Sequence, residues 1–244
     1  MAKNGRTPIV DPREAEKRRS LLIKIGAAVV LIALAVGIGV WVVQSNKSAT
    51  GSSADVTVAT DNAYRITAAP QGTEPPVTVN IVEDFQCPAC RQFEEQFSDV
   101  LGQLRANPKV AVDYQPIAFL DRMSSTEYST RSANASACVA QATAGGGNFD
   151  TWLKFHNLLY ANQPEEGGAG LTDGQLNDYA KQAGAPNVRQ CIEDRQYADF
   201  VQETTQKAQQ AGVTATPTVS INGKPVQLST PEALLQAVDQ AAQN

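Results

Sequence analysis

The chain has 244 residues, of which 42% are hydrophobic and 18% charged, and its formal net charge is −5. This length allows one large or two small domains with a buried core. The acidic balance argues against a nucleic-acid-binding protein, which needs a concentrated basic surface.

An apolar segment follows a basic tail at residues 1–24, which carry seven Lys and Arg and three acids. Residues 25–43 contain no charged side chain. As a helix they would span about 29 Å, close to the roughly 30 Å apolar core of a bilayer. The positive-inside rule then places residues 1–24 in the cytoplasm and the rest of the chain outside it. The alternative is a cleaved signal peptide, whose apolar core is shorter, about 7–15 residues.

Residues 44–61 are rich in Ser, Ala, Thr and Gly and predict a flexible stalk. The first part of the folded domain is expected at residues 62–123. It contains a short strand over Tyr64–Ala68, a buried strand over Val77–Val82, and a later strand over Val110–Tyr114. Between the last two strands, an apolar face at helical spacing predicts a long helix: Phe93, Phe97, Leu101 and Leu104.

Cys87-Pro88-Ala89-Cys90 opens this helix directly after a strand, the setting in which a CxxC pair becomes a redox catalyst. Free backbone N–H groups and the helix dipole favour a thiolate at Cys87, which is therefore the predicted nucleophile. Cys90, one turn into the helix, is the predicted resolving thiol. Pro88 suits the first helical turn. Two alternatives remain: a local structural disulfide, or half of a zinc site.

Zinc is not expected, and neither is any other metal or cofactor. A structural zinc site usually needs two closely spaced ligand pairs, whereas this chain has one close pair and a single histidine. That residue, His156, follows Phe155 in an apolar helix and is predicted to be a packing or surface residue. Glu83 and Asp84 could influence the thiols, but as acids at a strand end they are not assigned a catalytic role.

Residues 124–211 predict an all-helical insertion without convincing strands. Ser124–Glu127 and Thr172–Gln175 each match a capping box, and Gly145–Gly147 ends the first of these helices. An apolar stripe predicts a second helix: Phe149, Trp152, Phe155, Leu158 and Leu159. Further helices are expected over residues 186–194 and 197–210.

The last part of the domain is expected at residues 212–244. Strand character returns at Val213 and at residues 225–228, with Asn222-Gly223 as the hairpin turn between them. Thr230-Pro231 starts a final helix, with proline in its first turn.

The four cysteines all follow the apolar segment, in a compartment where disulfides persist. Three pairings are possible, and sequence proximity favours Cys87–Cys90, which leaves Cys138–Cys191. The second bridge is predicted to be a structural staple in the helical insertion. The alternative, a second redox pair, lacks an activating motif.

The strand–CxxC–helix unit, followed much later by Gly212-Val213-Thr214-Ala215-Thr216-Pro217-Thr218, resembles the thioredoxin fold. The helical block between the two parts is similar to that of DsbA-like thiol:disulfide oxidoreductases, in their membrane-anchored bacterial branch. The resemblance implies an α/β thioredoxin fold with an inserted helical domain over residues 62–244. It also implies that Thr216 and a cis Pro217 lie against the CxxC and bind an extended peptide substrate. The alternative is an ordinary trans proline at a strand start.

By the same resemblance, the chain introduces disulfides into reduced secreted or cell-envelope proteins, and a quinone-linked membrane partner of the DsbB or VKOR type reoxidises it. Ala89 and Ile81 stand where the best-studied oxidases have a histidine and often an acid. We therefore expect the reduction potential of this chain to lie between those of DsbA and thioredoxin. DsbA is a stronger oxidant, with a potential near −120 mV, and thioredoxin a weaker one, near −270 mV. Two other functions remain open: a reductase or isomerase of the same fold, and a non-catalytic module that binds extended peptides.

Overall fold

The computed structural model describes residues 55–227 and 229–243. Within these residues, no helix has the length and apolar character required to cross a bilayer. The predicted cytoplasmic tail and anchor at residues 1–43, and most of the stalk, lie outside the described residues. Residues 55–61 differ from the expected flexible stalk, because Val56 is buried and the Thr57 N–H donates to Gln141 Oε1 at 2.9 Å. The packed domain therefore includes residue 55 onward rather than starting at residue 62.

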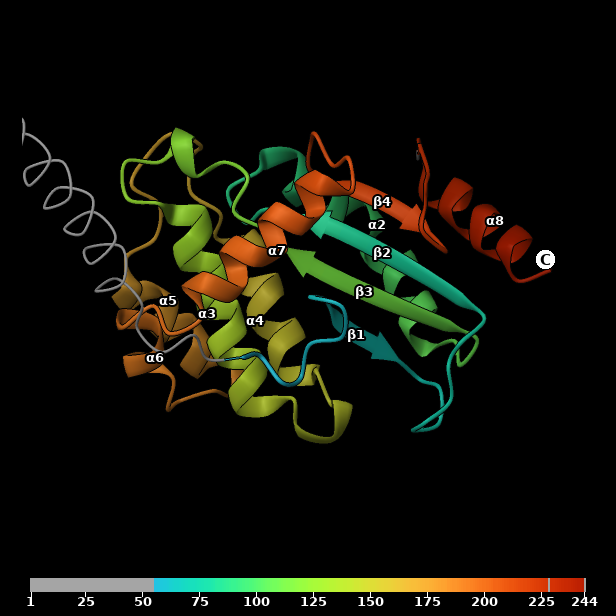
Figure 1. Cartoon of the computed structure of the whole chain (residues 1–244), viewed down its shortest axis with the longest axis horizontal. Helices are drawn as coiled ribbons and strands as arrows, with labels where there is room; N and C mark the ends of the chain where they lie inside the picture. Colours follow the sequence, from blue (N-terminus) through green and yellow to red (C-terminus); the bar gives the residue numbers. More distant parts are fainter. Residues whose placement is uncertain (1–54, 228, 244) are drawn as a thin grey trace, which may run out of the picture. The chain divides into compact units, whose positions relative to one another are not determined.

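A mixed sheet of five strands forms the centre of the domain, in the order β1-β3-β2-β4-β5 (Figure 1). Its strands are β1 Tyr64–Thr67, β2 Val77–Glu83, β3 Val110–Pro116, β4 Thr218–Ile221 and β5 Lys224–Pro225. Only β2 and β3 pair in parallel, while β1, β4 and β5 join antiparallel. The two parallel strands are central and their apolar residues are buried, as expected for strands covered on both faces.

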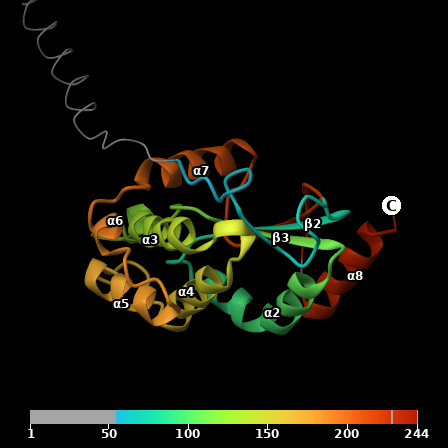
Figure 2. The same cartoon turned by 90° about the horizontal axis from the view of Figure 1, so that it is seen from below.

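Three helices cover the sheet: α2 Pro88–Ala106, α7 Ala198–Gln210 and α8 Pro231–Ala241. Figure 2 shows α7 on one side of the sheet and α2 and α8 on the other. The apolar face predicted for α2 is buried, with Phe93 stacked on Phe97 at a centroid distance of 4.5 Å. The sequence therefore located the face of α2 that packs on the sheet.

The helical insertion separates the two parts of the sheet in sequence, as predicted. Its elements are η1 Asp121–Met123, α3 Tyr128–Thr143, η2 Gly145–Gly147, α4 Asp150–Ala161, α5 Asp173–Ala183 and α6 Arg189–Glu193, after which α7 leads back to the sheet. Trp152 on α4 is fully buried and its indole N–H donates to Ser136 Oγ of α3 at 2.8 Å. The predicted Cys138–Cys191 disulfide is present and joins α3 to α6.

The capping box predicted at Ser124–Glu127 is wrong. Helix α3 begins only at Tyr128, and its N-cap residue Glu127 has φ 54° and ψ 47° without a side-chain cap. With this left-handed backbone, Glu127 cannot continue a helix that starts at Ser124. Outside the helix, the Thr126 carbonyl accepts a hydrogen bond from Arg131 Nε at 2.9 Å. Ser124 Oγ instead accepts the N–H of Tyr128 at 3.1 Å.

The capping box at Thr172 is confirmed. Thr172 Oγ1 accepts the Gln175 N–H at 3.2 Å, and the Gln175 side chain accepts the Thr172 N–H at 2.9 Å. We expect Thr172→Ala to lower the free energy of unfolding by about 1 kcal/mol, because an N–H of α5 loses its partner. Urea unfolding measures this change. Thr172→Ser, which keeps the hydroxyl, should stay close to the parent; equal losses in both variants would contradict the capping role.

The C-terminal part differs from its prediction at one boundary. The strand begins at Thr218 rather than at Val213, because residues 213–217 form the loop that carries the cis Thr216–Pro217 bond. The Asn222-Gly223 turn is present, with φ 48° and 74° at its two residues, as a type I′ hairpin requires. The second strand, β5, is shorter than expected, and Leu228 lies outside the described residues. Thr230 caps α8 and Pro231 occupies its first turn, as predicted.

Candidate active site

Sheet register brings the two predicted site segments together. Strands β2 and β4 run antiparallel with Val82 opposite Thr218. The residues that follow β2 therefore meet those that precede β4, although they are far apart in sequence. As a result, Cys87 Sγ lies 3.3 Å from the carbonyl oxygen of Thr216, to which it donates a hydrogen bond when the thiol is protonated. The Thr216–Pro217 bond is cis, as the family resemblance implied.

The two cysteines of the CxxC are free thiols in very different surroundings. Cys87 is the N-cap of α2, with Pro88 as the first helical residue. Cys90 is fully buried, and its Sγ accepts the N–H of Asp84 at 3.5 Å. Ala89 is exposed and Pro88 partly so. Cys87 is buried too, but it keeps 7% of its surface exposed whereas Cys90 has none, so Cys87 is the more accessible of the two thiols.

The surroundings separate the pKa values of the two thiols. A hydrogen bond from the Cys90 thiol lowers the pKa of Cys87 to about 6, against the opposing effect of burial, and the Thr216 side chain and the N–H groups of Cys90 and Ala89 lower it further. Burial raises the pKa of Cys90 well above its usual value, and the neighbouring Cys87 raises it further. At neutral pH the pair thus holds one thiolate, on Cys87, and one thiol.

Alkylation of the reduced protein by iodoacetamide should follow this separation. We expect the rate to rise with pH around a midpoint of about 6, since only the thiolate is nucleophilic, with Cys87 as the modified residue in mass spectrometry. Cys90→Ala should move the midpoint upward, because it removes the largest cause of the low pKa. A midpoint near 8.5 in the parent protein, the value of an ordinary thiol, would contradict the assignment.

The loop before the CxxC is held by contacts that the sequence did not reveal. The Asp84 carboxylate accepts the backbone N–H groups of Gln86, Phe119 and Leu120, each at 2.8 Å. The Gln163 side chain donates to the carbonyls of Phe85 and Cys87, both at 2.9 Å. Asp84 is thus an organiser of the loop, and Gln163 connects the helical insertion to the redox pair.

Glu83 and His156 form a buried pair that the sequence also did not indicate. His156, predicted to be a packing or surface residue, is fully buried, and its Nε2 lies 2.9 Å from Glu83 Oε1. Burial favours the neutral imidazole, but the charges of Glu83 and Glu94 outweigh it and raise the pKa of His156 to about 9. Burial also raises the pKa of Glu94 to about 7. No local sequence signal reports this pairing, since the two residues stand 73 positions apart.

Comparison with known proteins agrees with this geometry. The family model described as thioredoxin matches residues 72–240. The crystal structure of oxidised DsbA from Mycobacterium tuberculosis superposes with a TM-score of 0.64 at 32% identity, over 75% of this chain and 93% of that one. Disulfide bond formation protein D of Bacillus subtilis is 27% identical over 157 residues, which are 61% of this chain and 64% of that protein.

A further relative is matched over only a small part of its length. The serine/threonine-protein kinase PknE of Mycobacterium tuberculosis is 34% identical over 122 residues, which are 48% of this chain but only 21% of the kinase. The match thus spans about a fifth of that curated relative. Taken together with the cis-proline loop and the reduced CxxC at a helix N-terminus, these matches show that the chain belongs to the thioredoxin family, in its DsbA-like branch.

Proposed function

We propose that the chain is an extracytoplasmic thiol:disulfide oxidoreductase that introduces disulfides into reduced secreted or cell-envelope proteins. One observation carries this proposal: Cys87, with a pKa of about 6, lies at a helix N-terminus beside a Cys90 thiol whose pKa is raised. A stabilised thiolate favours the reduced enzyme, so the Cys87–Cys90 disulfide is a good oxidant.

The reaction consists of two thiol–disulfide exchanges. A substrate thiolate attacks Cys87 Sγ of the oxidised enzyme, the Cys87–Cys90 bond breaks, and Cys90 takes up a proton as it leaves. A second substrate thiolate then attacks the substrate sulfur of this mixed disulfide and releases Cys87 as a thiolate. The substrate loses two electrons and the enzyme gains them. In this proposal the Thr216 carbonyl, which lies beside Cys87, aligns an extended substrate backbone next to the cis Pro217.

The membrane setting is part of the proposal. The uncharged run at residues 25–43 and the basic tail before it favour a single-pass anchor with a cytoplasmic N-terminus. The disulfide between Cys138 and Cys191 fits a domain folded in an oxidising compartment. A quinone-linked membrane protein of the DsbB or VKOR type is the proposed reoxidant, and an anchor keeps the dithiol near such a partner.

The redox potential and the direction of exchange test this function together. We expect equilibration with glutathione to give a potential between about −120 and −250 mV, because the pKa of Cys87 lies between those of DsbA, about 3.5, and thioredoxin, about 7. The oxidised chain should also accelerate the refolding of a reduced, disulfide-containing substrate. A potential below about −250 mV, or activity only in reducing insulin disulfides, would favour a reductase instead.

A further inference from the structure

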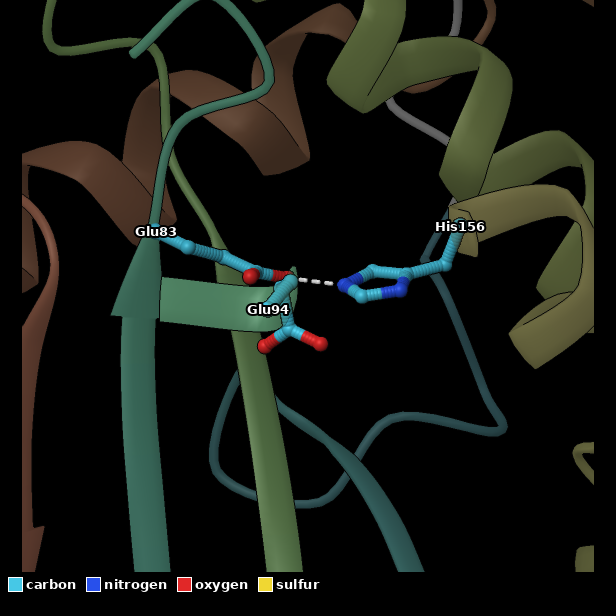
Figure 3. A group of neighbouring side chains, drawn as sticks. All are labelled: Glu83, Glu94 and His156. Carbon is cyan, nitrogen blue, oxygen red and sulfur yellow. Dashed lines mark hydrogen bonds and ion pairs between the residues drawn. The ribbon is translucent and has the colours of Figure 1, made fainter. Parts of the chain in front are cut away.

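Three side chains with metal-binding atoms converge within the fold, each from a different element: Glu83 at the end of β2, Glu94 on α2 and His156 on α4. One ligand atom of each lies within 4.8 Å of the other two. Figure 3 shows the Glu83 carboxylate directed at the imidazole ring, with the Glu94 carboxylate beside them. The disulfide exchange proposed above uses none of these groups directly.

The outward-facing atoms of two of these side chains already have partners. His156 Nδ1 lies 3.0 Å from Asn157 Oδ1, which orients Nε2 toward Glu83. Glu83 Oε2 accepts a hydrogen bond from the Tyr160 hydroxyl at 3.1 Å, which leaves Oε1 toward the imidazole. Metal-binding histidines and carboxylates in proteins are oriented by such outer hydrogen bonds. The arrangement therefore directs one nitrogen and one oxygen toward the same point.

Glu94 supplies the observation that points to a cation. Its Oε1 is buried and has no hydrogen-bond partner among the described residues. Burying a carboxylate oxygen without a partner is unfavourable unless a cation or donor satisfies it. Arg105, the nearby cation, donates instead to the Tyr114 hydroxyl. The Glu94 oxygen is thus available to a ligand within the cluster.

A pocket of about 220 Å³ adjoins the cluster and includes Glu94, Ser98, Arg105 and Tyr160 in its lining. It offers a route for an ion from solvent and room for a water molecule as a further ligand. Two carboxylates and one imidazole are a donor set that suits zinc or manganese, with three protein ligands and an open position. This set uses no cysteine, so it differs from the cysteine-based zinc site that the sequence argues against.

We propose that Glu83, Glu94 and His156 bind one divalent transition-metal ion of the zinc or manganese class, with the open position facing this pocket. Binding replaces the proton on His156 Nε2 by the metal ion and releases that proton to solvent. The Nδ1–H group keeps its hydrogen bond to Asn157 Oδ1. Both carboxylates then face a divalent charge, and the Glu94 oxygen gains its partner.

The test is calorimetric titration of the full chain with ZnCl₂ and, separately, MnCl₂, after removal of metals by chelation. The Cys87–Cys90 pair is first oxidised, so that no free thiol can bind zinc. We expect one site per chain. Glu94→Gln, which keeps the size of the side chain, should weaken binding at least about 100-fold, and Tyr160→Phe about 10- to 100-fold, the usual effect of losing an outer hydrogen bond.

Asp99→Asn is the matched control, because it also neutralises one carboxylate on α2. Asp99 is exposed and lies outside both the cluster and the lining of the pocket. The metal affinity of this variant should equal that of the parent. X-ray absorption of the zinc-loaded parent should find nitrogen and oxygen ligands only, a readout that does not depend on how the variants fold. Absence of saturable binding, equal weakening by Asp99→Asn, or sulfur in the coordination sphere would each overturn the proposal. These outcomes leave the redox function untouched, since its test measures the redox potential and exchange activity of Cys87–Cys90.

Discussion

Replacing Cys87 by serine should reduce disulfide exchange to the uncatalysed rate. The hydroxyl of serine stays protonated at neutral pH and cannot form a mixed disulfide, so both exchange steps are lost. The free Cys90 thiol cannot substitute, because it is fully buried and burial raises its pKa. The measurement is the refolding of a reduced, disulfide-containing substrate, with free thiols counted over time.

Cys90→Ser is the matched variant, and it should differ from Cys87→Ser in its ability to form an adduct with substrate. It also loses catalytic turnover, but Cys87 remains reactive. With a substrate activated as a mixed disulfide, the Cys90→Ser protein should accumulate a stable Cys87–substrate adduct, because no resolving thiol is present to break it. The adduct is detected by non-reducing electrophoresis. Refolding activity retained by Cys87→Ser, or an adduct formed through Cys90, would reverse the roles assigned to the two thiols.

Removing the Cys138–Cys191 bridge should lower the free energy of unfolding by about 4 kcal/mol. The two cysteines are 53 residues apart, and a closed loop of this size restricts the unfolded chain by about that amount in the chain-entropy model. The bridge also holds α6, a helix of five residues that is too short to be stable by itself. Urea unfolding of Cys138→Ala/Cys191→Ala compared with the parent, both with the CxxC oxidised, measures the effect.

A variant without the redox pair measures the contribution of this bridge to stability by itself. In Cys87→Ser/Cys90→Ser, Cys138–Cys191 is the one remaining disulfide, so unfolding with and without dithiothreitol reports its contribution alone. The loss should match that of the double alanine variant. Unchanged unfolding midpoints in both experiments would mean that the bridge is not structural, and the alternative of a second redox pair would gain support.

Local patterns predicted much of the fold. The apolar spacing on α2, the capping box at Thr172 and the Asn222-Gly223 turn each depend on residues close in sequence, and all three are present in the structure. The capping box at Ser124 is wrong because Glu127 has a left-handed backbone, beside a Thr126 carbonyl that binds the Arg131 guanidinium. That guanidinium also donates to the carbonyl of Leu171, a contact across 40 residues that no local pattern reports.

The residues of the candidate site were likewise predictable only where they stand in a local sequence motif. Cys87, Cys90 and Pro217 stand in recognisable motifs, and the structure brings their segments together. Gln163 follows no motif, yet its side chain donates to two carbonyls of the active-site loop. The partners of Glu83 are likewise set by the packing of α4 on the end of β2, which depends on the whole domain.

The order of the cysteines along the chain has a consequence for biogenesis. Cys87 and Cys90 come first along the chain, and Cys138, which pairs with Cys191, comes later. Each native pair therefore joins two cysteines that are consecutive in the sequence. If the chain is exported from its N-terminus, as proposed, these residues emerge in that order. Pairing on emergence therefore yields the native bridges without crossed intermediates, and we expect maturation of this protein to need no disulfide isomerase.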